Sequence, residues 1–283
     1  MDRWLTHLFR WLGAAAGTFA GLVALQLVRL RRMEFLPGHP GFYVNHVVPP
    51  AGAEPAGRRL RLVVLGDSTT AGVGVERAAD SLPHLLARRL ADRRGRAVHV
   101  VSYGWAGARV ADLVRAQLPR ALEPLRAGEA DPFLPGADVV AVVIGANDAT
   151  HNTPPRRYRA DLRAVLTGIR AAAPAAEIVL AGIPRFRGAL PAAEPLIFLA
   201  DQYARLLRPI GRAEAARIGA SHADLAAEVP RRVDRGTPFL SRDRFHPSAV
   251  GYGIWADVIA DALLAGSTAP DRAPEARLEA SGT

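Results

Sequence analysis

The sequence predicts a three-layer α/β/α sandwich in which helices cover both faces of a central parallel sheet. Short apolar runs rich in valine and isoleucine alternate with longer segments of helical pattern along most of its 283 residues. Such alternation is typical of parallel sheets, because each return to the same edge of the sheet needs a crossover helix. With 49% hydrophobic and 22% charged residues, the composition is that of a globular domain.

An uncharged apolar segment precedes these elements. Residues 11–28 carry no charge and lie between Arg10 and a cluster of arginines at positions 29, 31 and 32. A helix of this length is just long enough to span a bilayer. We therefore expect residues 1–33 to form an uncleaved membrane anchor, with a signal peptide as the alternative. The similar arginine content of the two flanks leaves the side of the membrane open.

Composition divides the remainder into three parts. Residues 34–57 are rich in proline and glycine and predict an extended linker. Residues 58–265 carry the strand and helix patterns and predict one domain. Residues 266–283 are small and polar and predict a disordered tail.

Within the domain, each apolar run is the length of a buried strand. We expect strands at residues 62–65, 98–101, 139–144 and 178–183, with a weaker one near 218–225. Helical patterns lie between them at residues 80–94, 108–125, 156–172 and 196–217. A last helix is expected over residues 248–264, because Pro247 suits a helix start.

The first apolar run ends abruptly in Gly66-Asp67-Ser68, followed by small residues and further glycines at 72 and 74. The glycines predict a sharp turn at the carboxyl end of the strand, which is the edge where open α/β sheets place their ligands. Ser68 would then project into a cleft with little bulk around it. A lone serine in this position usually caps the next helix, so its role depends on partners at later strand ends.

Three later stretches supply such partners. The second strand run is followed by Ser-Tyr-Gly-Trp-Ala-Gly at residues 102–107, and the third by Gly-Ala-Asn-Asp at 145–148. Asp-Arg-Phe-His-Pro at residues 243–247 precedes the last helix. The first two follow parallel strands and share an edge of the sheet with Ser68, and the third can reach that edge from a loop.

Together these four blocks resemble the SGNH superfamily of GDSL-type esterases and lipases. The resemblance covers residues 61–264, with the blocks in the family's order. Two positions depart from the family pattern, since Thr69 replaces the usual leucine and Ser102 stands where asparagine is common. The resemblance implies a flavodoxin-like fold and hydrolysis of carboxylic esters.

The resemblance also implies roles for individual residues. Ser68 would be the nucleophile, His246 the base that takes its proton, and Asp243 the carboxylate that orients the imidazole. The oxyanion would be held by the backbone N–H groups of Ser68 and Gly107 and by the Asn147 side chain.

Several assignments near these blocks stay open. Gly107 is preferred to Gly104 because it follows Ser102 by the family's usual spacing, but Gly104 remains an alternative. Trp105 could form an acyl or sugar wall or pack against a helix. His151 could line the cleft, although an exposed loop is the default for such a residue.

The amino-acid composition limits which ligands and partners we expect for the chain. The chain has no cysteine, which excludes disulfides and a cysteine nucleophile. All of its 36 basic residues are arginine, and the net charge is +9. These arginines are scattered over the predicted helices without interleaved aromatic residues, so we expect no nucleic-acid partner. No metal-ligand spacing and no Walker lysine occurs, and we expect no metal and no cofactor.

The sequence thus predicts a membrane-associated serine esterase that acts on small-molecule or lipid esters and contacts the membrane through residues 11–28. A thioesterase, a carbohydrate O-deacetylase or an acyltransferase would use the same site. A basic binding module that has kept the fold without catalysis is the alternative from another class.

Overall fold

The computed structural model describes residues 2–31, 36, 42–52, 57–125, 132–186 and 194–267. The predicted tail lies outside these residues from position 268 onward. Part of the predicted linker, at residues 34–35, 37–41 and 53–56, also lies outside them.

A six-stranded sheet forms the centre of the domain, with strand order β1-β3-β2-β4-β5-β6. All neighbouring strands are parallel except β1, which runs antiparallel to β3. The expected three-layer fold is confirmed, and the sheet is mixed rather than purely parallel. The strands are β1 (Asn45–Val48), β2 (Leu60–Gly66), β3 (Val98–Ser102), β4 (Val139–Val143), β5 (Glu177–Ala181) and β6 (Ser221–Ala223).

Strand β1 comes from the stretch that the sequence predicts to be a linker. It pairs Asn45 with Val101 and Val48 with Val98, so part of residues 34–57 belongs to the sheet. Its four residues are half polar, as suits an edge strand with one neighbour, and they carry too little apolar signal to predict a strand.

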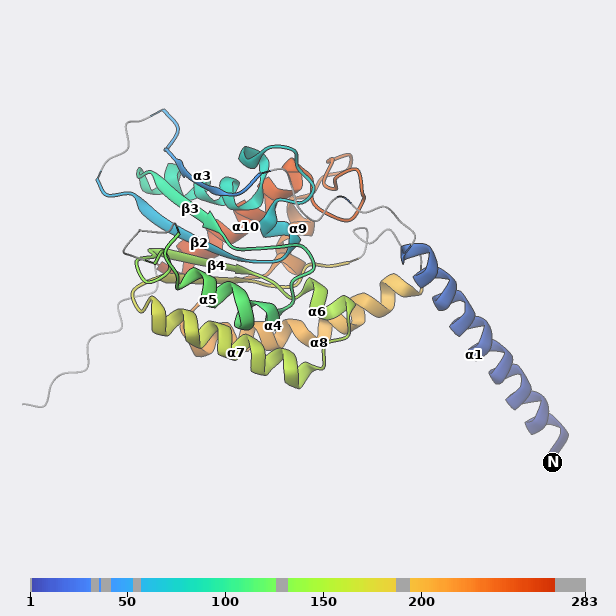
Figure 1. The fold of residues 1–283 in the computed structure, drawn as a ribbon. Helices are drawn as coiled ribbons and strands as arrows, with labels where there is room; N and C mark the ends of the chain where they lie inside the picture. The colour runs from blue at the N-terminus through green and yellow to red at the C-terminus, as the bar shows by residue number, and fades with distance from the viewer. Residues whose placement is uncertain are drawn as a thin grey trace, which may run out of the picture.

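Helices cover both faces of the sheet (Figure 1). One face carries α3 (Leu82–Arg94), α9 (Leu225–Arg232) and α10 (Ala249–Ser267). The other carries α7 (Pro155–Ala172), α8 (Leu196–Arg217) and the continuous run of α4 (Val110–Asp112), the π-helical turn η2 (Leu113–Gln117) and α5 (Leu118–Ala121). Three short helices, α2 (Ser68–Ala71), η1 (Ala78–Asp80) and α6 (Ala146–Thr150), lie in the loops.

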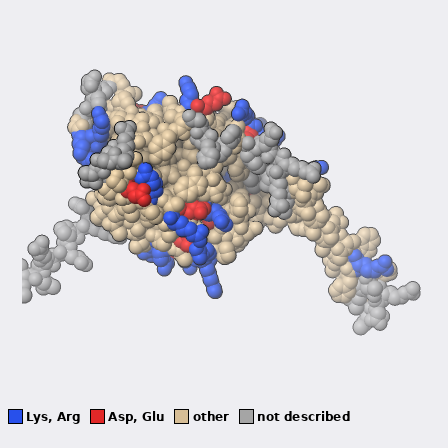
Figure 2. Space-filling model, viewed as in Figure 1, with Lys and Arg blue, Asp and Glu red and all other residues tan. Residues whose placement is uncertain are grey.

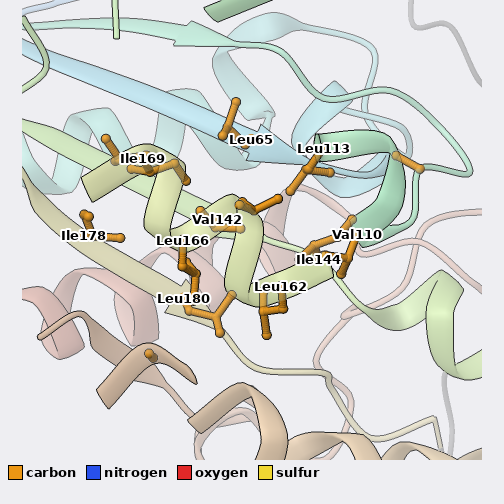
Figure 3. Packing of buried hydrophobic residues seen from close by; sticks show 14 of the residues in the cluster. Leu65, Val110, Leu113, Val142, Ile144, Leu162, Leu166, Ile169, Ile178 and Leu180 are labelled. Carbon is orange, nitrogen blue, oxygen red and sulfur yellow. The ribbon is translucent and has the colours of Figure 1, made fainter. Parts of the chain in front are cut away.

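Successive side chains of β2 divide the core into two halves. Val63 and Leu65 pack against α7 and the α4–α5 run, whereas Leu62 and Val64 pack against α3 and α10. This alternation follows from the two-residue period of a strand. Figure 3 shows the first half, in which side chains from β2, β4 and β5 meet the apolar face of α7.

Helix α1 (Asp2–Arg31) stands away from the domain (Figure 1). Many of its described apolar side chains are exposed, among them Trp11 and Phe19. Among the described residues, two segments are long and apolar enough to cross a bilayer, His7–Gln26 in α1 and Ala249–Gly266 in α10. The α10 segment is 44% buried and packs against α3 and the sheet, so it is a core helix of the domain.

Candidate active site

The serine predicted to be the nucleophile lies where β2 turns into α2. Ser68 is the first residue of α2, and the preceding Asp67 caps that helix by accepting hydrogen bonds from the Thr69 N–H at 3.0 Å and the Thr69 hydroxyl at 2.8 Å. Burial raises the pKa of Asp67, and the bonds from Thr69 act against that rise. The Asp67 carboxylate is therefore occupied in shaping the turn that presents Ser68.

A histidine reaches Ser68 from the loop before α10. His246 Nε2 lies 2.9 Å from the Ser68 hydroxyl oxygen, and His246 Nδ1 lies 2.6 Å from Asp243 Oδ2. With Nδ1–H donated to the carboxylate, Nε2 is left as the acceptor for the serine proton. All three side chains are buried.

Asp243 is held ionised by its neighbours. Its Oδ1 accepts hydrogen bonds from the Ser241 hydroxyl at 2.7 Å and from the backbone N–H groups of Phe245 and His246 at 2.9 Å each. Burial alone would raise the pKa of Asp243, but the bonds from His246, Ser241 and the two N–H groups outweigh it and lower the pKa to about 2. The group beside the imidazole is thus a carboxylate at any ordinary pH.

The other two predicted oxyanion donors come from the segments that follow β3 and β4. Asn147, in α6, donates one Nδ2 hydrogen to the Ala108 carbonyl at 3.0 Å, which leaves the second for a ligand. Gly107, next to Ala108, has a positive φ of 81°. Among the described residues, the Gly107 N–H has no hydrogen-bond partner, whereas the Gly104 N–H donates to the Ser102 hydroxyl at 3.4 Å. Of the two glycines, Gly107 therefore has the available donor.

Gly104 has a packing role instead. A Cβ on Gly104 would lie 1.8 Å from the Thr70 hydroxyl oxygen and 3.0 Å from the Asp67 carbonyl oxygen. Only glycine lets the loop after β3 approach the serine turn this closely.

A cavity of about 910 Å³ opens beside Ser68, Asn147 and His246. This volume is near the upper end of the range for small-molecule sites. Polar side chains line one wall, where α8 contributes Asp201, Gln202 and Arg205. The rest is mostly apolar, with contributions from Phe186, Ile197, Phe198, Leu225, Val229, Pro230, Val233, Pro238, Phe239, Leu240, Phe245 and Trp255.

Comparison with known proteins gives this arrangement a family. Residues 64–254 match the model of the GDSL-like lipase/acylhydrolase family, a span that includes all four sequence blocks. The chain belongs to that family. It is therefore a hydrolase of the GDSL type, as the motifs predict.

Solved structures of GDSL and related hydrolases share the fold. The extracellular lipase from Streptomyces rimosus is 25% identical, with a TM-score of 0.54 over 72% of this chain and 99% of that one. The lipase/acylhydrolase from Enterococcus faecalis is 23% identical, with a TM-score of 0.53 over 71% and 94%. Phospholipase A1 from Streptomyces albidoflavus NA297 is 22% identical, with a TM-score of 0.50 over 72% and 99%. No curated protein sequence matches the chain.

Gly107 and the two residues that the sequence offered as substrate-lining, Trp105 and His151, lie outside the described lining of the cavity in this GDSL hydrolase. Trp105 packs against the core on the α7 side, and His151 is exposed with its Nδ1 2.9 Å from the Asn147 carbonyl oxygen. Neither is among the described residues that line the cavity. Both therefore contact neighbours of the site rather than its interior.

One supporting residue has no counterpart in the sequence motifs. Gln117 is fully buried in the π-helical turn η2, where its Oε1 accepts from the Gly66 N–H at 2.9 Å and its Nε2 donates to the Gly66 carbonyl at 2.7 Å. Strand β3 pairs with β2 only as far as Val64, opposite Ser102. The Gln117 side-chain amide thus makes the two hydrogen bonds to Gly66 that the backbone of β3 would make if that strand continued.

Proposed function

We propose that the chain is a serine esterase in which Ser68, His246 and Asp243 form the catalytic triad. The observation that carries this proposal is the continuous series of contacts, 2.9 Å from serine to histidine and 2.6 Å from histidine to carboxylate, beside a large cavity. A serine hydroxyl becomes a useful nucleophile when a neighbouring base accepts its proton.

In the first half-reaction, Ser68 Oγ attacks the ester carbonyl carbon while its proton passes to His246 Nε2. The carbonyl oxygen becomes an oxyanion, which accepts hydrogen bonds from the N–H groups of Ser68 and Gly107 and from Asn147 Nδ2. Removing one such donor costs about 3–4 kcal/mol in known hydrolases. The tetrahedral intermediate then expels the alcohol, which takes the proton from His246 and leaves an acyl group on Ser68.

In the second half-reaction, His246 accepts a proton from water as the water attacks the acyl-serine. Collapse of this intermediate releases the carboxylic acid and returns the proton to Ser68. Asp243 remains ionised throughout and stabilises the imidazolium that forms in each half-reaction. The low pKa of Asp243, about 2, suits that role.

The mostly apolar lining of the cavity favours a substrate whose acyl group is apolar and binds inside the cavity. Burying a methylene group contributes about 0.8 kcal/mol to the binding free energy, so a long acyl chain against these apolar side chains contributes several kcal/mol. We expect medium and long acyl esters to be preferred to acetyl esters.

We also propose that α1 anchors the enzyme in a membrane. A helix that stands clear of its domain with tryptophan, phenylalanine and leucine side chains exposed is unfavourable in water. In a bilayer the same side chains are solvated by lipid, and the helix satisfies its own backbone groups. On the face shown in Figure 2, arginine and acidic side chains are interspersed over the domain, which argues against a nucleic-acid surface there.

Turnover of p-nitrophenyl esters from acetyl to palmitoyl by the full chain in detergent tests the esterase. The wild type should hydrolyse them with a chain-length optimum, and Ser68→Ala should lose at least about 10³-fold in kcat/KM. Ser221→Ala, a serine of β6 outside the site, is the matched control and should keep full activity. Full activity in a folded Ser68→Ala variant would contradict the proposal.

A further inference from the structure

Helix α1 contacts the domain through Gln26. Gln26 is only 6% exposed, and its side-chain amide makes two hydrogen bonds to the start of α8. Its Nε2 donates to the Glu194 carbonyl at 2.7 Å, and its Oε1 accepts from the Leu196 N–H at 3.2 Å. The end of the apolar segment 11–28 is thereby fixed to the N-terminus of α8.

These bonds satisfy groups that would be costly to leave unpaired near lipid. Leu196 is the first residue of α8, and the N–H groups of a first helical turn have no partner within the helix. The Gln26 amide is itself a polar group in an apolar helix, where it needs a partner. The Gln26 amide and the backbone at the start of α8 thus satisfy each other's hydrogen-bonding groups. Such mutual pairing matters most at the edge of a lipid bilayer, where water is scarce.

The residues that follow in α8 connect this contact to the catalytic cavity. Phe198 lines the cavity and is nonetheless 50% exposed, so it lies at the cavity mouth. Leu199, 40% exposed, is one helical turn, or about 4.5 Å, beyond Leu196. Figure 1 shows that α1 leaves the domain at the end towards which the parallel strands point. Ser68 lies at the same end, because it follows the last residue of β2.

We propose that the first turn of α8 is a second membrane contact, which holds the cavity mouth against the bilayer that contains α1. Leu199 and Phe198 would enter the interface, and an ester lipid could pass from the bilayer past Phe198 to Ser68 without crossing water. The inference rests on the membrane placement of α1 given under the proposed function.

The charges around this surface suit an anionic lipid headgroup layer. Arg29 is exposed one turn after Gln26, and Arg185 and Arg205 line the cavity and are exposed. Long arginine side chains place their charge at headgroup level while their stems lie along apolar surface. Basic side chains close to an anionic leaflet are attracted to it, and the attraction weakens as the salt concentration rises.

Site-directed spin labelling tests the surface directly, because the chain has no cysteine and a single one can be introduced at will. Nitroxides are placed at Phe19, Leu199 and Leu122 of the full chain in nanodiscs of phosphatidylcholine and phosphatidylglycerol. Leu122, 42% exposed, is the matched control, because it lies at the opposite end of the sheet from α1. Its neighbour Ala121 bonds Leu134, and the nearby Pro132 carbonyl bonds Arg61 at the amino end of β2. Collisions with oxygen report lipid, and collisions with a water-soluble nickel chelate report water.

Positions 19 and 199 should show a several-fold higher ratio of oxygen to nickel collisions than position 122. Gln26→Leu should lower the ratio at position 199 towards that at 122 and leave position 19 unchanged. A lipid-like position 19 with a water-like position 199 would overturn the second contact alone. A water-like position 19 would overturn the anchor and the contact together, and neither result depends on esterase activity.

Discussion

The two loops that meet at the Ser68–His246 hydrogen bond are supported in different ways. The serine turn is held by distant parts of the chain, since Gln117 bonds the peptide of Gly66 and Gly104 packs against the turn. The histidine loop is held by its own residues, because Asp243 accepts bonds from Ser241, Phe245 and His246. A short motif can therefore specify the second loop by itself, whereas the first needs the assembled sheet.

The contrast predicts different consequences of mutation. A change in the histidine loop should affect catalysis more than folding, because its contacts are local and lie next to the reacting atoms. A change in the support of the serine turn should affect folding as well, because it leaves buried groups of the sheet unpaired.

The largest effect is expected from Asp243→Asn. An asparagine amide at this position donates to Nδ1, so the histidine proton moves to Nε2, which can no longer accept the serine proton. We expect kcat/KM for a p-nitrophenyl ester to fall about 10⁴-fold at pH 7, together with a lower melting temperature, because the stabilisation by the ionised carboxylate is also lost. Asp92→Asn, which alters an exposed carboxylate of α3, is the control. A loss smaller than tenfold would show that the carboxylate does not orient His246.

The next effect is expected from Gln117→Met, which keeps the side-chain volume but removes both polar atoms. The Gly66 N–H and C=O would then be buried without these partners, at a cost of about 1–3 kcal/mol each. We expect the free energy of unfolding in urea to fall by about 2–6 kcal/mol. A decrease below about 1 kcal/mol would mean that water or another group replaces the amide and that the serine turn does not depend on Gln117.

Gly74→Ala tests the point where the two loops touch. Gly74 has a positive φ of 107°, and a Cβ there would lie 2.5 Å from the Pro247 carbonyl oxygen and 3.1 Å from His246 Cβ. We expect a loss of about 1–3 kcal/mol in stability, with reduced kcat as His246 is displaced. Gly253→Ala is the matched control, because Gly253 lies in α10 with open space around it and alanine favours a helix. Unchanged kcat and stability in Gly74→Ala would refute the contact.

Ser241→Ala should give the smallest effect and a distinct pH dependence. The folded pKa of Asp243, about 2, lies below its ordinary value of 3.8, so its contribution to stability is present above about pH 4 and is lost as the pH falls through 2. Without the Ser241 bond the folded pKa rises and that contribution shrinks. Because Ser241 is half-buried and water can replace it, we expect a loss of about 0.5–1.5 kcal/mol at pH 7. Urea unfolding should show this difference diminishing towards pH 2, and a difference that grows in acid would show that the Ser241 bond does not stabilise the ionised form of Asp243.

The sequence predicts the fold well where a pattern is long or wholly apolar. Helix α8 has the predicted bounds of 196–217, and β2, β3 and β4 lie where the apolar runs are. Strand β1 and helix α9 are not predicted, because each is short and the burial that stabilises it comes from its neighbours. The π-helical turn η2 has no sequence signal of its own.

For the site, the motifs predict which side chains lie at one edge of the sheet but not what supports them. The partner of Gln117 is 51 residues away, and the bond depends on where β3 ends. Trp105 lies in the second block and His151 three residues after the third, yet the direction of each side chain depends on packing that the sequence does not reveal.

The most direct test of the proposed triad is to map the residue that reacts with a fluorophosphonate. Trypsin cleavage after Arg61 and Arg77 releases a peptide of residues 62–77, in which Ser68 is the one serine. We expect stoichiometric labelling of this peptide in the wild type, and loss of labelling in Ser68→Ala and in His246→Ala. Labelling of another peptide, or undiminished labelling of Ser68 without His246, would contradict the central claim that His246 activates Ser68.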